Sequence, residues 1–162
     1  DILRLSELDA STEVPMEEID LYELAEKCVS MLQISAEKQN VTLMLTGKPT
    51  RMQANREMME ELLYNLVSNA IRYNRPYGNV VVSVSREDDH VDLAVEDTGI
   101  GISQADQGRI FERFYRVDKS RSKSTGGTGL GLAIVKHVVQ CHGAKLDLKS
   151  QLGSGTRIEI KF

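Results

Sequence analysis

Apolar residues recur along this chain with two different periods, and this alternation limits the possible folds more than any other feature. Between positions 55 and 73 the apolar side chains fall every three or four residues, the spacing of one face of an α-helix. Between 80 and 96 they fall at every second residue, as in a strand with one buried face. Both patterns recur elsewhere in the 162 residues, so the chain is expected to bury helix faces against a sheet.

Three segments after residue 20 have the helical spacing, and each carries a capping signal. The first begins after Asp20, an N-cap with Glu23 three positions later. The second begins at the N-cap Asn55, and the third ends before Gly143, a C-cap. The expected helices span approximately residues 21–40, 55–73 and 129–142.

Segments with the strand period lie between and after these helices. Val80–Arg86 and Val91–Glu96 flank a polar turn, so they are expected to pair as a hairpin. A strand over Val41–Leu45 is expected to pair with a short strand near Met52. The mixed order of the elements predicts a sheet covered by helices on one face. The last two strands are expected over residues 145–150 and 156–162.

The first nineteen positions carry less pattern. Residues 1–9 have apolar side chains at helical spacing and read as the end of a longer helix. Residues 10–19 are mostly polar, contain Pro15 and are interpreted as a linker.

Composition narrows the class of protein. The formal net charge of −4 disfavours a general nucleic-acid-binding role. No stretch approaches the ~20 consecutive apolar residues of a membrane span. The two cysteines, Cys28 and Cys141, fall in predicted helices outside any CxxC or metal-ligand spacing, and they are interpreted as reduced core residues.

Polar residues interrupt the apolar pattern of the helix predicted over 55–73. Asn65 and Asn69 stand four positions apart, and Arg72 and Tyr73 continue the same face by one more turn. An amide oxygen is a neutral, hard ligand that suits Mg²⁺, and a guanidinium can neutralise phosphate. A solvated helix edge is the alternative, although two asparagines inside a helix oppose its intrinsic propensity.

A glycine-rich turn, Asp97-Thr98-Gly99-Ile100-Gly101-Ile102, follows directly after a predicted strand. A carboxylate held there can accept a hydrogen bond from an exocyclic amine such as that of adenine, and it would reject the carbonyl of guanine. The glycines allow the backbone to approach a ligand closely. On its own the pattern also fits a plain glycine turn.

A second glycine run, Gly126-Gly127-Thr128-Gly129-Leu130-Gly131-Leu132, leads into the last predicted helix. Backbone N–H groups at a helix N-terminus bind phosphate without a cation. The run matches neither a Walker loop nor the GxGxxG pattern. A flexible linker is the alternative, but alternation of glycine with leucine before an apolar helix favours phosphate binding.

Between the two glycine runs lies Phe111-Glu112-Arg113-Phe114-Tyr115-Arg116, followed by a basic, polar stretch. The phenylalanines can anchor the segment, whereas residues 115–128 have few apolar groups to bury and are expected to be mobile, as lids are. A solvated loop is the alternative for the cations. A nucleic-acid patch fits poorly with an aromatic content of 5%.

Taken in order, these motifs resemble the N, G1, F and G2 boxes of sensor histidine kinases, and the resemblance covers about residues 15–162. It implies a Bergerat fold, a two-layer α/β sandwich whose mixed, mostly antiparallel sheet is covered by three helices on one face. It also implies that residues 13–162 form the catalytic ATP-binding domain, and that residues 1–12 end the second dimerisation helix and start the linker. The matching stretches are Asn65-Leu-Val-Ser-Asn69-Ala-Ile-Arg72-Tyr73, Asp97-Thr-Gly-Ile-Gly101, Phe111-Glu-Arg-Phe114-Tyr-Arg116, Gly127-Thr-Gly129-Leu-Gly131-Leu and, as the last glycine box, Gly153-Ser-Gly155-Thr156.

The same resemblance implies roles for the matching residues. Asn69 would ligate Mg²⁺, and Asn65 would support the metal–phosphate site as a catalytic residue. Arg72 would meet phosphate, and Tyr73 would lie beside the nucleotide. Asp97 would hold the adenine amine.

The other implied residues lie in the loops. Arg116 would act as a catalytic residue that approaches the γ-phosphate of ATP. Thr156 would help to fix Asp97 through a water molecule. The remaining implied nucleotide-binding residues are Gly99, Gly101, Ile102, Gly127, Thr128, Gly129, Leu130, Gly131 and Leu132.

One departure separates this chain from part of the wider superfamily. The ATP-hydrolysing relatives of the gyrase and Hsp90 type carry a glutamate, four residues before the metal-binding asparagine, that activates water. Asn65 stands at that position here, and an amide cannot serve as a base. The resemblance therefore favours phosphoryl transfer, in which the protein mainly positions groups and neutralises charge.

A histidine kinase needs a histidine that accepts the phosphoryl group. The chain contains His90, His137 and His142, and none of them begins a His-Glu pair on a dimerisation helix. All three are interpreted as structural. The acceptor is expected upstream of Asp1.

The resulting prediction is a protein-histidine kinase domain that binds Mg²⁺ and ATP or ADP. It would transfer the γ-phosphoryl group to its own dimerisation domain for relay to a response regulator, with no nucleic-acid partner. The isolated domain is expected to be monomeric and cytoplasmic, within a homodimeric protein anchored in the membrane. Two alternatives stay open: an ATPase of the gyrase or chaperone type, and a non-enzymatic scaffold for a response regulator.

Overall fold

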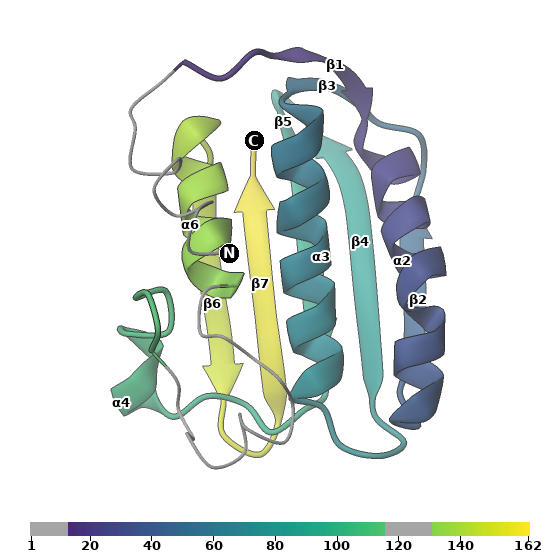
Figure 1. Ribbon diagram of the computed structural model, residues 1–162, viewed down its shortest axis with the longest axis vertical. Coiled ribbons are helices and arrows are strands. Elements are labelled where there is room, and N and C mark those ends of the chain that lie inside the picture. The colour runs from purple at the N-terminus through teal and green to yellow at the C-terminus, as the bar shows by residue number, and fades with distance from the viewer. Residues whose placement is uncertain (1–12, 116–130) are drawn as a thin grey trace.

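The segments with helical and strand periods form helices and strands close to the predicted positions (Figure 1). The computed structural model describes residues 13–115 and 131–162, so the helix end predicted over residues 1–9 lies outside it. The described elements are β1 (Glu17–Asp20), α2 (Leu21–Lys38), β2 (Thr42–Gly47), β3 (Arg51–Ala54), α3 (Arg56–Arg72), β4 (Asn79–Glu87), β5 (His90–Asp97), α4 (Gln104–Gln107), α6 (Gly131–Cys141), β6 (Lys145–Gln151) and β7 (Gly155–Lys161).

Five strands form the main sheet, in the order β2-β4-β5-β7-β6. Strands β2 and β4 are parallel, and every other neighbouring pair is antiparallel. Helices α2, α3 and α6 lie together over one face of the sheet (Figure 1). This arrangement confirms the predicted two-layer α/β sandwich with a mixed, mostly antiparallel sheet.

The core lies between the helices and the sheet, where the two periodic patterns meet. Val80, Val82 and Val84 point from β4 into the core and are at most 1% exposed. The intervening residues of β4 face the opposite, uncovered side of the sheet, because successive side chains of a strand alternate. The predicted apolar stripe of α3 is buried in full and consists of Met59, Leu62, Leu63, Leu66 and Ala70.

The predicted helix caps are confirmed. Oδ1 of Asp20 accepts a hydrogen bond from the N–H of Tyr22 at 3.0 Å, and Oδ1 of Asn55 accepts one from Met58 at 3.0 Å. Each cap satisfies a donor that the first helical turn leaves unpaired. Gly143 follows α6 with a positive φ of 59°, as expected of a C-cap glycine.

Two sequence-based expectations were wrong. The predicted linker over residues 10–19 contains strand β1, and the strand near Met52 pairs with β1 instead of β2. Ile19 stands opposite Met52 in this two-stranded antiparallel sheet and is 2% exposed. Four-residue strands are too short to show a period, and Ile19 joins the hydrophobic core only in the tertiary structure, so the sequence alone could not predict this pairing.

The two ends of the main sheet carry different features. The end of α3, the end of β5 and the β6–β7 turn lie at the lower end in Figure 1, whereas α6 starts nearer the middle of the sheet. The β4–β5 turn and the end of β7 lie at the opposite, upper end. None of the described helices combines the length and the apolar character needed to cross a bilayer.

Candidate functional site

Asp97, the last residue of β5, is held by two backbone N–H groups from separate parts of the chain. Gly99 and Thr156 both donate to Oδ1 of Asp97, at 2.9 Å and 3.2 Å. The described residues make no hydrogen bond to the other carboxylate oxygen, Oδ2. The backbone therefore fixes one oxygen and leaves the other to accept a donor.

Burial acts against the charge of this carboxylate. Desolvation raises the pKa of Asp97 above its ordinary value of 3.8, although the hydrogen bonds from Gly99 and Thr156 act in the lowering direction. The two hydrogen bonds thus offset only part of the free-energy cost of burying the charge of Asp97. A ligand that donates a hydrogen bond to Oδ2 would stabilise the ionised form further.

Glycines around Asp97 allow backbone segments to touch each other. A Cβ at Gly99 would lie 2.4 Å from the carbonyl oxygen of Tyr73, which also accepts a hydrogen bond from the N–H of Ile100 at 3.1 Å. Gly101 has a φ of +71°, and a Cβ there would lie 2.1 Å from the carbonyl oxygen of Gln151. The loop after β5 is therefore packed between the end of α3 and the β6–β7 turn.

Ser150 joins this loop to the start of β7. Its Oγ accepts a hydrogen bond from the N–H of Ile102 at 2.8 Å and donates to the carbonyl of Gly155 at 3.0 Å. Since Ser150 has one hydroxyl proton, Thr156 Oγ1, 2.8 Å away, is the donor in the pair of hydroxyls. Thr156 itself contacts Asp97 directly through its backbone N–H, and this contact is separate from the predicted one through water.

Arg75 is a structural residue of the site that the sequence did not reveal. Its Nη2 donates to the carbonyl of Gly99 at 3.0 Å and to the carbonyl of Gly153 at 2.8 Å. The guanidinium thus connects the loop after β5 to the β6–β7 turn, on either side of Asp97. A single arginine in a loop has no spacing signal, so sequence reasoning had no basis for selecting it.

The short helix α4 is attached to the same loop. Nε2 of Gln107 donates to the carbonyls of Ile102 and Ser150, at 2.9 Å and 3.0 Å. Further along, the hydroxyl of Tyr115 donates to the carboxylate of Asp106. These bonds keep the segment after the glycine turn against the end of β6.

Asn65 presents its amide oxygen toward the start of α6. Its Nδ2 donates to the carbonyl of Glu61 at 2.8 Å, which sets the orientation of the amide. A Cβ at Gly131 would lie 3.0 Å from Oδ1 of Asn65, so the glycine permits this close approach. The packing of α3 against α6 therefore places an amide oxygen beside the first residue of α6.

The other predicted residues of α3 lie nearer to its C-terminal end. Asn69, Arg72 and Tyr73 are all partly exposed, and no ion pair to Arg72 forms within residues 13–115 and 131–162. The carbonyl contact of Tyr73 with Ile100 brings this end of the helix against the loop after Asp97. The structure thus brings the predicted α3 and β5 residues to one end of the sheet.

The second glycine run is described only in part. Gly131 is the first residue of α6, and Leu132 is partly buried and packs against the core. The predicted site residues that lie outside the described part of the chain are Arg116, Gly127, Thr128, Gly129 and Leu130.

Two of the three histidines have structural contacts. Nε2 of His142 accepts a hydrogen bond from the N–H of Asn55 at 3.1 Å, so the proton is on Nδ1, 2.7 Å from the carbonyl of Val138. Nε2 of His137 lies 3.3 Å from Sγ of Cys141. His142 therefore ties the end of α6 to the cap of α3.

Comparison with known families agrees with this arrangement. Residues 54–162 match the family described as histidine kinase-, DNA gyrase B-, and HSP90-like ATPase. That range includes every part of the site described above, from α3 to β7.

Curated proteins with similar sequences are sensor kinases. Sensor-like histidine kinase SenX3 of Mycolicibacterium smegmatis is 39% identical over 165 residues, which span 100% of this chain and 43% of the relative. Sensor histidine kinase YkoH of Bacillus subtilis is 35% identical over 161 residues, which span 99% of this chain and 35% of the relative. The chain therefore corresponds to less than half of the length of either protein.

Solved structures show the same fold. The mycobacterial sensor histidine kinase MprB superposes with a TM-score of 0.79 at 27% identity, covering 91% of this chain and 97% of that structure. Full-length ShkA in complex with AMPPNP superposes with a TM-score of 0.84 at 25% identity, covering 99% of this chain and 34% of that structure. The chain belongs to the histidine kinase-, DNA gyrase B- and HSP90-like ATPase family, and within it the chain is similar to the ATP-binding catalytic domains of sensor histidine kinases.

Proposed function

We propose that this chain binds ATP with Mg²⁺ and presents the γ-phosphoryl group to a histidine on the dimerisation segment of its kinase. The phosphoryl group would then pass to an aspartate of a response regulator. Residues 13–162 would form the nucleotide-binding domain, and residues 1–12 the end of the dimerisation helix and the linker. The domain would be monomeric and cytoplasmic, within a homodimeric, membrane-anchored protein that has no nucleic-acid partner.

The orientation of Asp97 is the observation that carries this proposal. Oδ1 is occupied by the backbone N–H groups of Gly99 and Thr156, so only Oδ2 can accept a ligand donor. The exocyclic amine of adenine is such a donor, whereas guanine has a carbonyl at the same position. Asp97 would therefore select adenine nucleotides.

The polar face of α3 fits the phosphate end of the nucleotide. Asn65 turns an amide oxygen toward the start of α6, and Asn69 stands one helical turn further on. In the proposal Asn69 ligates Mg²⁺ and Asn65 supports the metal–phosphate site, while Arg72 neutralises phosphate charge. Bound Mg²⁺ supplies charge neutralisation at the phosphate oxygens, and it suits the hard oxygen ligands of this face.

The remaining proposed contacts surround this face. Tyr73 would lie beside the nucleotide, next to the loop that begins at Asp97. Arg116 would approach the γ-phosphate. The backbone N–H groups of the glycine boxes would bind phosphate at the start of α6, where the helix dipole also favours anions. The residues proposed for these boxes are Gly99, Gly101, Ile102, Gly127, Thr128, Gly129, Leu130, Gly131 and Leu132.

Hydrolysis of ATP is the second candidate function, and the chemistry of Asn65 speaks against it. An amide oxygen is too weakly basic to take a proton from water, and Nδ2 of Asn65 already donates to the carbonyl of Glu61. Phosphoryl transfer to an imidazole needs no such base, because a neutral imidazole nitrogen is already nucleophilic. Sustained hydrolysis by the isolated domain would favour the ATPase instead.

Nucleotide selectivity tests the binding half of the proposal. Calorimetric titration with ATP, ADP and GTP in the presence of Mg²⁺ should show binding of both adenine nucleotides and far weaker binding of GTP. Equal affinities for ATP and GTP would contradict the role proposed for Asp97.

Transfer to a separate acceptor tests the catalytic half. The domain is mixed with a dimerisation fragment of a related kinase and with ATP labelled at the γ-phosphate, and the acid-labile label on histidine is followed over time. An acceptor fragment with its histidine replaced by alanine is the control. Good ATP binding without any transfer would favour the non-enzymatic scaffold.

A further inference from the structure

Three potential metal ligands lie together at the end of the sheet opposite Asp97. Glu87 ends β4, and His90 and Asp92 lie in β5, where Glu87 stands opposite His90 across the hairpin. His90 and Asp92 project from the face of the sheet that the helices leave uncovered, because Val91 between them faces the core. Glu87 projects from the same face, since it is paired with His90 across the hairpin. Their ligand atoms lie within 4.8 Å of one another.

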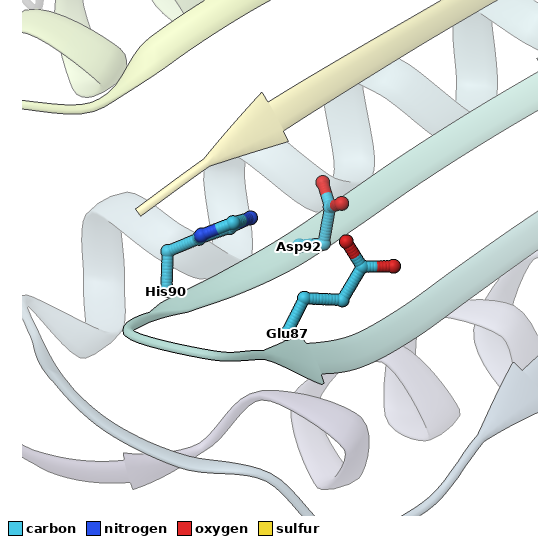
Figure 2. Close-up of side chains that lie close together, drawn as sticks. All are labelled: Glu87, His90 and Asp92. Atoms are coloured by element: carbon cyan, nitrogen blue, oxygen red, sulfur yellow. The ribbon is translucent and has the colours of Figure 1, made fainter.

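Two atoms of this cluster are buried without a hydrogen-bond partner in the described part of the chain. They are Nε2 of His90 and Oδ1 of Asp92. Figure 2 shows the ring of His90 extending toward the carboxylate of Asp92, with the carboxylate of Glu87 beside it. Buried polar atoms are nearly always satisfied, so two unpartnered atoms in one cluster of potential ligands indicate a ligand that would satisfy them.

The surrounding charge favours a cation. Asp88 and Asp89 form the turn between the two strands, and Glu159 lies close enough to act on Asp92. The nearby cation is Lys161, which stands opposite Asp92 in β7. Nζ of Lys161 is 3.6 Å from Oε1 of Glu159, so the positive charge of Lys161 is already paired with this carboxylate.

We propose that Glu87, His90 and Asp92 bind a divalent transition-metal ion of the Zn²⁺ class. An imidazole nitrogen together with carboxylates suits zinc and its neighbours, whereas Mg²⁺ and Ca²⁺ prefer oxygen ligands alone. Bonds of about 2.0–2.2 Å place ligand atoms at most about 4.4 Å apart, and the 4.8 Å limit of this cluster is close to that spacing. The side chain of Glu87 is exposed and can rotate to complete the site. Water completes the coordination, and the site joins the two strands at their turn.

This site is separate from the proposed nucleotide site in position and in chemistry. The β4–β5 turn and the end of β5 lie at opposite ends of the same strand (Figure 1). The Mg²⁺ proposed at Asn69 accompanies a nucleotide, whereas the ion at the β4–β5 turn is held by protein side chains and water and needs no nucleotide. Its binding can therefore be measured without nucleotide.

Another pair of side chains could bind the same class of ion and provides the matched control. Nε2 of His137 lies 3.3 Å from Sγ of Cys141 on α6. Nε2 of His142 is already occupied, because it accepts the N–H of Asn55. The competing site on α6 thus depends on Cys141. Cys141→Ser removes its thiol ligand and leaves the cluster at the β4–β5 turn intact.

The test is a calorimetric titration of the nucleotide-free chain with Zn²⁺, repeated with Co²⁺, Mg²⁺ and Ca²⁺. Wild type and Cys141→Ser should bind one Zn²⁺ with equal affinity, and His90→Gln and Asp92→Asn should weaken binding by about 10-fold or more. Glu87→Gln should have a smaller effect because Glu87 is exposed. Mg²⁺ and Ca²⁺ should not compete for the site.

Unchanged Zn²⁺ affinity in His90→Gln, or its loss in Cys141→Ser, would overturn the proposal. Retention of ATP binding in His90→Gln shows that the variant is folded. If that variant does not fold, the proposal is tested on the wild type by following the NMR signals of its histidine rings during a Zn²⁺ titration. The proposal requires the ring signals of His90 to shift at one equivalent and those of His142 to stay in place.

Discussion

The backbone N–H of Thr156 donates a hydrogen bond to Oδ1 of Asp97 at 3.2 Å, across 59 positions of the chain. Together with the N–H of Gly99, it decides which oxygen of the carboxylate remains for a ligand. A neutral side chain at position 97 would still have to accept hydrogen bonds from the N–H groups of Gly99 and Thr156, and only its remaining polar atom could contact a ligand. The consequences for specificity and for stability can be measured separately.

Replacement of Asp97 by asparagine should strongly weaken ATP binding and reduce the discrimination against guanine. The amide oxygen of the new side chain would take the place of Oδ1, because the two backbone N–H groups need an acceptor. The NH₂ group would then face the ligand, where it opposes the adenine amine and can donate to the guanine carbonyl. Calorimetry should show a loss of ATP affinity of about 100-fold, equivalent to about 2.7 kcal/mol.

Glu96→Gln is the matched control for this substitution. It removes the same charge from the neighbouring position of β5, where the carboxylate is exposed and lies 3.1 Å from Arg157. ATP affinity should be unchanged in this variant. If Asp97→Asn kept the wild-type preference for ATP, the proposed contact with the adenine amine would be wrong.

Asp97→Asn should leave the unliganded domain as stable as the wild type, or more stable, at neutral pH. Burial raises the pKa of Asp97 in the folded state, so ionisation costs folding free energy. This cost is fully present above the raised folded-state pKa and disappears as the pH falls toward the ordinary value of 3.8. Chemical denaturation of both proteins between neutral and acidic pH should therefore show their difference shrinking with acidity; a difference that grows would contradict the prediction.

Gly101→Ala should destabilise the domain by about 2 kcal/mol or more. The φ of this residue is +71°, and the added Cβ would lie 2.1 Å from the carbonyl oxygen of Gln151. Gly108→Ala is the control, because Gly108 has a φ of −72° and no atom lies within 4 Å of its added Cβ. Urea titrations should show Gly108→Ala to be neutral or slightly stabilising; similar losses in both variants would show that the backbone conformation at Gly101 is not the cause.

Arg75→Met should lower ATP affinity by about 10-fold, equivalent to about 1.4 kcal/mol. The substitution removes the hydrogen bonds to the carbonyls of Gly99 and Gly153, which hold the two loops beside Asp97. Arg75→Lys can restore one of the two bonds and should have an intermediate affinity. Arg56→Met removes another exposed arginine, paired with Glu17 at 3.2 Å, and should leave ATP affinity unchanged.

The candidate site was predicted from local motifs, which carry little information on the contacts between distant residues. Asp97 and the glycines around it stand in one contiguous motif, so their chemistry could be predicted from neighbouring residues alone. Arg75 and Ser150 could not be found in this way, because their partners are up to 78 and 48 positions away. The direct contact of Thr156 with Asp97 was likewise missed, since it depends on the register of β5 against β7.

The sequence by itself determined the features that depend on residues a few positions apart. The buried stripe of α3, the caps Asp20 and Asn55, and the alternation in β4 all follow from local period and local hydrogen bonding. Only the tertiary structure decided the pairing of β1 with β3 and the orientation of Asp97. Both depend on which distant segments pack against each other, and no local pattern encodes that choice. The grouping of Glu87 with His90 and Asp92 depends instead on the exact register of the β4–β5 hairpin, which the alternating pattern alone leaves open.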